Sequence, residues 1–145
     1  MLEQVVIIFD GMQSMLKKLK KASYEKNMKE FRRCNGHFFQ EMTDYLDKQE
    51  NKEKAAEEVA CVFVKAVEEG FTVKGKIKGA LQADLNFFMI YYVFPAILLT
   101  EHSEAVLLAD AICAAWGNTF KNSKIDYTDY DKLYSSFREK ILGIF

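Results

Sequence analysis

The run from Leu81 to Leu99 (LQADLNFFMIYYVFPAILL) constrains the fold more than any other part of the chain, because no charged residue lies between Asp84 and Glu101. A helix that crosses a bilayer needs about 20 apolar residues, and this run is shorter and contains two tyrosines. Such a segment is typical of a helix buried on nearly all sides of a globular domain. We therefore predict a central helix over about residues 80–99. Its buried residues are expected to include Leu85, Phe88, Met89, Tyr92 and Val93.

Scarce chain-breaking residues favour helices elsewhere as well. The 145 residues include one proline and seven glycines, whereas strand-rich domains need many turns. A chain of this length is typical of one domain, so residues 1–145 are expected to form a single helical domain. The predicted fold is all-α, with orthogonal or bundle-like packing of about six helices around the central one. Apolar residues at helical spacing predict the other helices over about residues 2–22, 24–45, 52–69, 105–120 and 130–141.

Several residues predict where helices begin, bend or end. Gly70 is expected to terminate the third helix. Pro95 has no amide hydrogen and its ring clashes with the carbonyl of Tyr91, so it is expected to break or kink the central helix. Thr100 or Ser103 is expected to cap the next helix.

Charge and cysteine content argue against several functional classes. The formal net charge of −1 provides no overall attraction to nucleic acid or to an anionic membrane. Three widely spaced cysteines form no disulfide framework or zinc pattern, and the N-terminal sequence lacks the basic start of a secretory signal. No phosphate-binding loop or G-x-S-x-G motif occurs. We therefore expect a cytoplasmic protein with no membrane span, no metal, no cofactor and no catalytic residues.

Two local patterns receive structural interpretations. Cys34 and His37, three residues apart, share a helix face and could hold a metal or form a nucleophile–base pair. Because a structural zinc needs four ligands and cysteine is commonly buried, we favour a buried thiol beside a surface histidine. The basic stretch from Lys17 to Arg33 could contact phosphates, but its aromatic residues fall on the predicted core stripe. We interpret this stretch as a solvated helix face.

The best candidates for a binding pocket are polar and aromatic residues near the expected helix break. Asn35 and Asn86 each interrupt an apolar stripe, and a buried amide must find hydrogen-bond partners. The two amides could pair and set the helix register, which we favour, or they could line a small-molecule pocket between helices. Such a pocket would have a neutral, aromatic wall suited to a small apolar or aromatic ligand. Its predicted ligand-binding residues are Asn35, Asn86, Tyr91, Tyr92 and Trp116.

The second half of the chain contains three motifs that occur together in one group of proteins. They are FPAILL, ADAICAAW followed by Phe120, and IDYTDYDKLYSSFREKI. Through them the region of about residues 94–141 resembles an uncharacterised helical protein family of anaerobic Firmicutes. The resemblance implies a bacterial origin, and the family brings no assigned activity.

Aromatic residues are abundant, with 12 Phe, 7 Tyr and 1 Trp, and no catalytic constellation accompanies them. Aromatic side chains are enriched at the centres of protein interfaces. The sequence therefore predicts a non-enzymatic intracellular module that binds a protein partner or a second copy of itself. The alternative is a small-molecule-binding helical bundle or an enzyme, with its pocket near Pro95.

Overall fold

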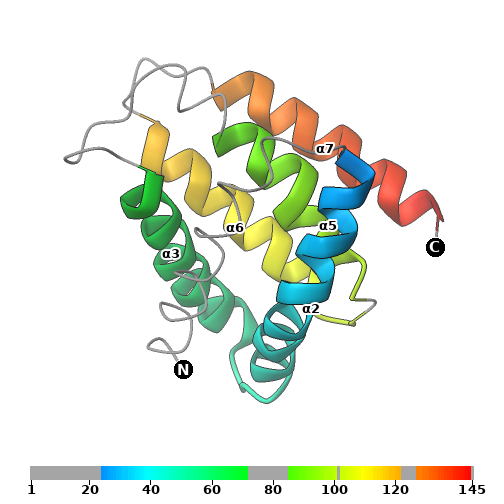
Figure 1. Cartoon of the computed structure of the whole chain (residues 1–145). Coiled ribbons are helices and arrows are strands. Elements are labelled where there is room, and N and C mark those ends of the chain that lie inside the picture. The colour runs from blue at the N-terminus through cyan, green and yellow to red at the C-terminus, as the bar shows by residue number, and fades with distance from the viewer. Residues whose placement is uncertain (1–23, 72–84, 101, 122–126, 145) are drawn as a thin grey trace.

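The computed structural model describes residues 24–71, 85–100, 102–121 and 127–144, so the helix predicted over residues 2–22 lies outside the described residues. The regular elements are α2 (Tyr24–Asp47), α3 (Lys52–Phe71), η1 (Met89–Val93), α5 (Phe94–Leu98), α6 (Ala105–Phe120) and α7 (Tyr127–Ile144) (Figure 1). Residues 85–88 are helical and lead directly into η1 and α5, so residues 85–98 form one continuous helix.

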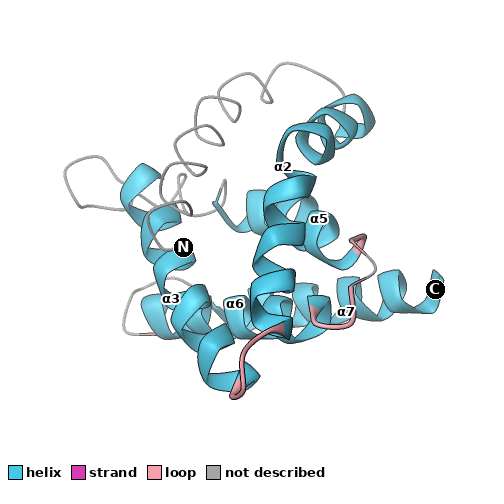
Figure 2. Cartoon of the chain, turned by 90° about the horizontal axis from the view of Figure 1, so that it is seen from below, coloured by secondary structure: helices cyan, strands magenta, loops and turns pink. Residues whose placement is uncertain are grey.

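Helices are the only regular elements in the part of the chain that the structure describes, where the segments between them are loops and turns (Figure 2). The all-α prediction is therefore confirmed. The predicted number of helices stays a prediction, because one of them precedes the described ranges.

Two predicted helix boundaries are wrong. Gly70 does not terminate α3, which continues to Phe71; one glycine inside a helix costs only about 1 kcal/mol relative to alanine. Neither Thr100 nor Ser103 is the N-cap of α6, which is Glu104. The hydroxyl of Thr100 instead donates to the carbonyl of Ile97 at 2.7 Å and so serves the end of the preceding helix.

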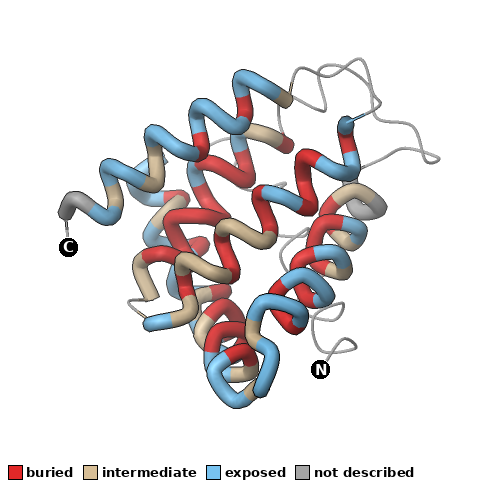
Figure 3. Tube along the Cα trace, turned by 180° about the vertical axis from the view of Figure 1, so that it is seen from behind, coloured by how far each residue is buried: buried red, intermediate tan, exposed pale blue. Residues whose placement is uncertain are grey.

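Helix 85–98 and α6 together occupy the centre of the described fold. Helix 85–98 contacts α2, α6 and α7, whereas α6 contacts α3, α5 and α7. Buried positions dominate both elements, and the outer side of α7 is exposed (Figure 3). The expected burial in helix 85–98 is confirmed, because the exposed fraction is 5% or less at Leu85, Phe88, Met89, Tyr92 and Val93.

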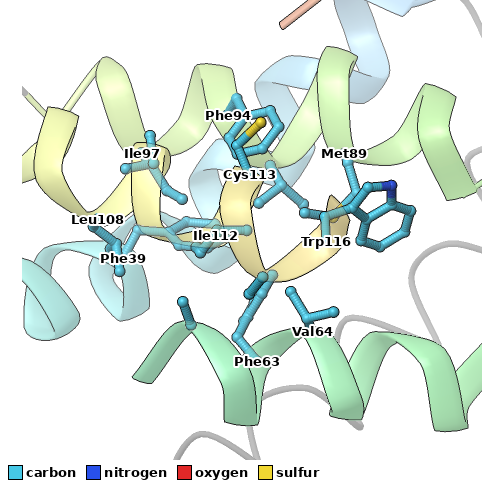
Figure 4. Close-up of a cluster of buried hydrophobic side chains, with 14 of the residues drawn as sticks. Phe39, Phe63, Val64, Met89, Phe94, Ile97, Leu108, Ile112, Cys113 and Trp116 are labelled. Carbon is cyan, nitrogen blue, oxygen red and sulfur yellow. The ribbon is translucent and has the colours of Figure 1, made fainter. Parts of the chain in front are cut away.

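The main core forms on both sides of α6. Phe63 and Val64 of α3 approach α6 from one side, and Met89 and Phe94 of helix 85–98 lie on the other (Figure 4). Trp116 of α6 is 1% exposed in this cluster. Because α6 is apolar toward both neighbours, it joins α3 to helix 85–98 in one continuous core.

Helix 85–98 passes through Pro95 without stopping. Its irregularity lies one turn earlier, in the π-helical turn Met89–Val93, where the amide of Phe94 donates to the carbonyl of Met89. A π-helical turn holds one more residue than an α-helical turn, which changes how the proline ring meets the carbonyls before it. The backbone is right-handed helical at Val93 and remains so at Leu99. Of the two outcomes predicted at Pro95, a kink or a break, the break does not occur, and a widened turn precedes the proline.

Candidate functional site

Asn86 and Trp116 are the predicted site residues that the structure joins directly. The indole nitrogen of Trp116 donates to the amide oxygen of Asn86 at 3.0 Å. The indole ring also stacks on Tyr130, with ring centroids 5.6 Å apart. A buried indole nitrogen needs an acceptor, so the amide of Asn86 has a structural role in linking helix 85–98 to α6.

The side chain of Asn35 forms a hydrogen bond within α2. Its amide nitrogen donates to the carbonyl of Phe31, one turn earlier, at 3.1 Å, and the side chain is buried. This bond satisfies one donor of the amide inside the core. The amide of Asn35 therefore has a backbone carbonyl of its own helix as a hydrogen-bond partner.

Tyr91 and Tyr92 lie in the π-helical turn and face different surroundings. Tyr92 is buried, with its ring 5.7 Å from Phe31. Tyr91 is 37% exposed, and its ring lies 4.6 Å from that of Phe87. The carbonyl of Tyr91, which Pro95 cannot serve because it has no amide hydrogen, accepts the hydroxyl of Tyr24 at 2.7 Å.

Of the five residues predicted to line a pocket, Asn86 and Trp116 are joined by a hydrogen bond. Tyr91 and Tyr92 are consecutive residues of the π-helical turn. The structure does show a cleft of about 480 Å³, but it lies between α2 and the end of α5. None of the five residues lines it. A ligand pocket formed by them stays a prediction.

Three residues of the cleft belong to the basic stretch that we interpret as a solvated helix face, and none of the others is a predicted site residue. The lining residues are Lys29, Arg32, Arg33, Gly36 and Gln40 of α2, together with Ala96, Leu99 and Thr100. A glycine in the middle of a helix, with basic residues one and two turns before it, was the available signal. Periodicity alone could not show that α5 ends opposite this face.

Cys34 and His37 do not form the buried-thiol arrangement that we favoured. Cys34 is exposed, with its sulfur 3.6 Å from a carboxylate oxygen of Glu30. The imidazole of His37 is exposed and lies 2.9 Å from Glu41. The prediction of a buried thiol is wrong because Asn35, the next residue, occupies the buried stripe of α2.

A second polar cluster lies between α6 and α7. The hydroxyl of Tyr127 donates to the carbonyl of Cys113 at 2.9 Å and lies 3.4 Å from its sulfur. The thiol also lies 4.0 Å from a carboxylate oxygen of Asp131. Burial is the largest cause that raises the pKa of the Cys113 thiol, to about 11. At neutral pH this thiol is protonated and therefore a poor nucleophile.

No group of three or more histidine, cysteine, aspartate or glutamate side chains is placed to hold a metal ion among the described residues. Within the same ranges, no helix has the length and apolar character that crossing a membrane requires. No protein-family model matches the chain, and no curated protein or solved structure is significantly similar to it. The resemblance to the Firmicutes family therefore rests on the sequence motifs alone.

Proposed function

We propose that this chain is a non-enzymatic helical interaction module that binds a second copy of itself. In this proposal the protein is bacterial and cytoplasmic. It forms a single domain of about six helices around the central one. The observation that carries the proposal is an exposed cluster of aromatic side chains on the described surface.

This aromatic patch consists of Tyr24, Phe87 and Tyr91, which are 41%, 51% and 37% exposed. The rings of Phe87 and Tyr91 lie 4.6 Å apart, and the ring of Tyr24 meets that of Tyr91 edge-on at 5.9 Å. Single exposed apolar residues are normal on protein surfaces, but rings gathered in one place mark interaction sites. Tyrosine and phenylalanine are also enriched at interface centres.

A second copy suits this patch for two reasons. The hydroxyl of Tyr24 already has an acceptor in the carbonyl of Tyr91, so burying the patch would not leave that hydroxyl without a partner. A net charge of −1 per chain causes little repulsion between copies. In a two-fold dimer the patch meets itself, and each aromatic pair contributes about 0.5–1.5 kcal/mol beyond the area it buries.

The test compares two charge substitutions at equally exposed apolar positions. Phe87→Glu introduces a carboxylate into the patch, whereas Leu133→Glu does so on α7, at a residue that is 50% exposed. We expect the wild-type chain to dimerise with rising concentration in sedimentation-equilibrium measurements. Phe87→Glu should weaken dimerisation at least about tenfold, equivalent to about 1.4 kcal/mol, and Leu133→Glu should leave it unchanged.

Two results would overturn the proposal. One is a strictly monomeric wild-type chain at the highest concentration that remains soluble. The other is a loss of dimerisation in Leu133→Glu that equals or exceeds the loss in Phe87→Glu. A larger loss would assign self-association to α7. Helical circular dichroism should be retained in both variants, because neither side chain is buried.

A further inference from the structure

The cleft between α2 and the end of α5 has one strongly basic wall. Lys29, Arg33, Gly36 and Gln40 follow one another at intervals of three or four residues and so share one face of α2. Arg32 lies beside this row, three residues after Lys29 and four before Gly36. On the opposite wall the described residues are Ala96, Leu99 and Thr100, which are uncharged, and no acidic residue lines the cleft within the ranges that the structure describes.

Two of the three cations have no ion-pair partner among the described residues. Arg33 forms a two-pronged ion pair with Glu30, whose carboxylate oxygens lie 3.1 Å from its Nε and 2.5 Å from its terminal nitrogen. Of the residues that the structure describes, none forms an ion pair with Lys29 or Arg32. Like charges three residues apart on a helix repel and lower its stability. Stability of α2 therefore does not explain this arrangement.

Gly36 adds a second, independent observation. It lies inside α2, where glycine is less favourable than alanine by about 1 kcal/mol. A Cβ placed there would meet no atom within 4 Å outside its own helix, so close packing against a neighbour does not require glycine. Gly36 lines the cleft, and a side chain at this position would project into it. The glycine keeps open the space beside the cations.

We propose that this cleft binds the phosphate group of a small organic phosphate. Arginine offers several donors in a planar fork that matches phosphate oxygens, and lysine adds a point charge. The volume of about 480 Å³ is within the range of small-molecule sites. The amide of Gln40 and the uncharged wall beside Leu99 can contact the rest of the molecule.

The carbonyl end of α5 disfavours an anion in the cleft, but this effect is weaker than the attraction of the cations. The carbonyl end of α5 is close by and favours cations. The carbonyls of Pro95 and Ile97 are already occupied, because they accept the backbone amides of Leu99 and Thr100 at 2.9 and 3.1 Å. Lys29 and Arg32 carry full positive charges, whereas a helix end corresponds to about half an elementary charge.

The binding test is calorimetric titration of the whole chain at near-physiological salt. The probes are inorganic phosphate and adenosine monophosphate, with adenosine as the phosphate-free control. We expect one molecule of each phosphate to bind per chain and no binding of adenosine. Tighter binding of adenosine monophosphate would show that the uncharged wall recognises an organic body, whereas equal affinity would identify free phosphate as a sufficient ligand.

Three variants locate the site. Arg32→Gln should weaken phosphate binding at least tenfold, whereas Lys65→Gln, which removes an exposed cation from α3, should change it less than twofold. Gly36→Leu should weaken binding at least tenfold by filling the cleft, while the urea midpoint stays equal to or above that of the wild-type chain because leucine is the better helix former. A destabilised variant would lose both properties together.

Three results would overturn the proposal. The first is no binding of either phosphate by the wild-type chain. The second is equal weakening by Arg32→Gln and Lys65→Gln, which would show diffuse attraction rather than a site. The third is unchanged binding in Gly36→Leu. These outcomes are independent of self-association, because the aromatic patch shares no residue with the cleft.

Discussion

Two glycines in the described helices have opposite surroundings. A Cβ at Gly36 would meet open space, whereas a Cβ at Gly117 would lie 2.6 Å from Cε1 and 2.7 Å from the hydroxyl oxygen of Tyr127. Gly117 therefore permits the first residue of α7 to lie directly over α6. That position brings the Tyr127 hydroxyl to the carbonyl of Cys113, and the absence of a Cβ at Gly117 leaves room for the tyrosine ring.

We predict that Gly117→Ala destabilises the chain by about 1–3 kcal/mol in urea unfolding, since the ring of Tyr127 must move and lose its hydrogen bond. The higher helix propensity of alanine offsets at most about 1 kcal/mol of this loss. In a Tyr127→Ala background the same substitution should be neutral or stabilising, because the ring is absent. If Gly117→Ala destabilises both backgrounds equally, the contact with Tyr127 is not the cause.

At this scale the sequence could indicate that a residue needed a partner but not which partner it had. Asn86 interrupts an apolar run, so a buried amide with hydrogen bonds was predictable. Its partner Trp116 lies 30 positions away, and only the packing of two helices brings them together. The open space beside Gly36 was equally hidden, since helical periodicity does not show where α5 ends.

At the scale of elements, the π-helical turn and a hydrogen bond from Tyr24 both lie where Pro95 interrupts the regular hydrogen bonding of helix 85–98. Proline has no amide hydrogen to donate to the carbonyl of Tyr91, four residues earlier. The hydroxyl of Tyr24, from the first residue of α2, donates to this carbonyl at 2.7 Å. Helix 85–98 is therefore secured to α2 at its least regular turn.

A double-mutant cycle tests this coupling between Tyr24 and Pro95. Tyr24→Phe should lower the free energy of unfolding by about 0.5–1.5 kcal/mol, at the low end because the bond is partly exposed. Pro95→Ala restores a backbone amide that can serve the carbonyl of Tyr91. In that background Tyr24→Phe should cost less, giving a coupling energy of about 0.5 kcal/mol or more. Strict additivity of the two substitutions would contradict the role assigned to Tyr24.

Helix existence was predictable because apolar residues recur at helical spacing in α2, α3, α6 and α7. The burial of Leu85 and Val93 followed from the absence of charges around them. The helix ends were less predictable. Glycine and threonine often mark helix boundaries, but Gly70 lies within α3, and the hydroxyl of Thr100 donates to the end of helix 85–98. No sequence pattern distinguishes the π-helical turn from the α-helical turns on either side of it.

At the scale of the whole molecule, α6 and α7 enclose ionisable groups that strongly favour their protonated forms. Burial is the main cause that raises the pKa of Tyr130 and Tyr134 above 10.0, and the hydrogen bond to Asp110 raises that of Tyr134 further. Burial also raises the pKa of Cys113 from 9.0 to about 11. The folded state therefore retains protons that the unfolded chain releases in alkali.

This retention predicts alkaline unfolding. Below about pH 9 these groups are protonated in both states, so their stabilisation is complete; above it only the unfolded chain ionises, and the free energy of unfolding falls as the pH rises through about 11. Urea midpoints measured between these values should decrease steadily.

Tyr130→Phe provides the sharper test, because the buried hydroxyl of Tyr130 has no hydrogen-bond partner among the described residues. Removing that hydroxyl should raise stability at neutral pH by about 1 kcal/mol and reduce the alkaline loss. A destabilised Tyr130→Phe variant, or midpoints that do not change with pH, would contradict this account of the α6–α7 contact.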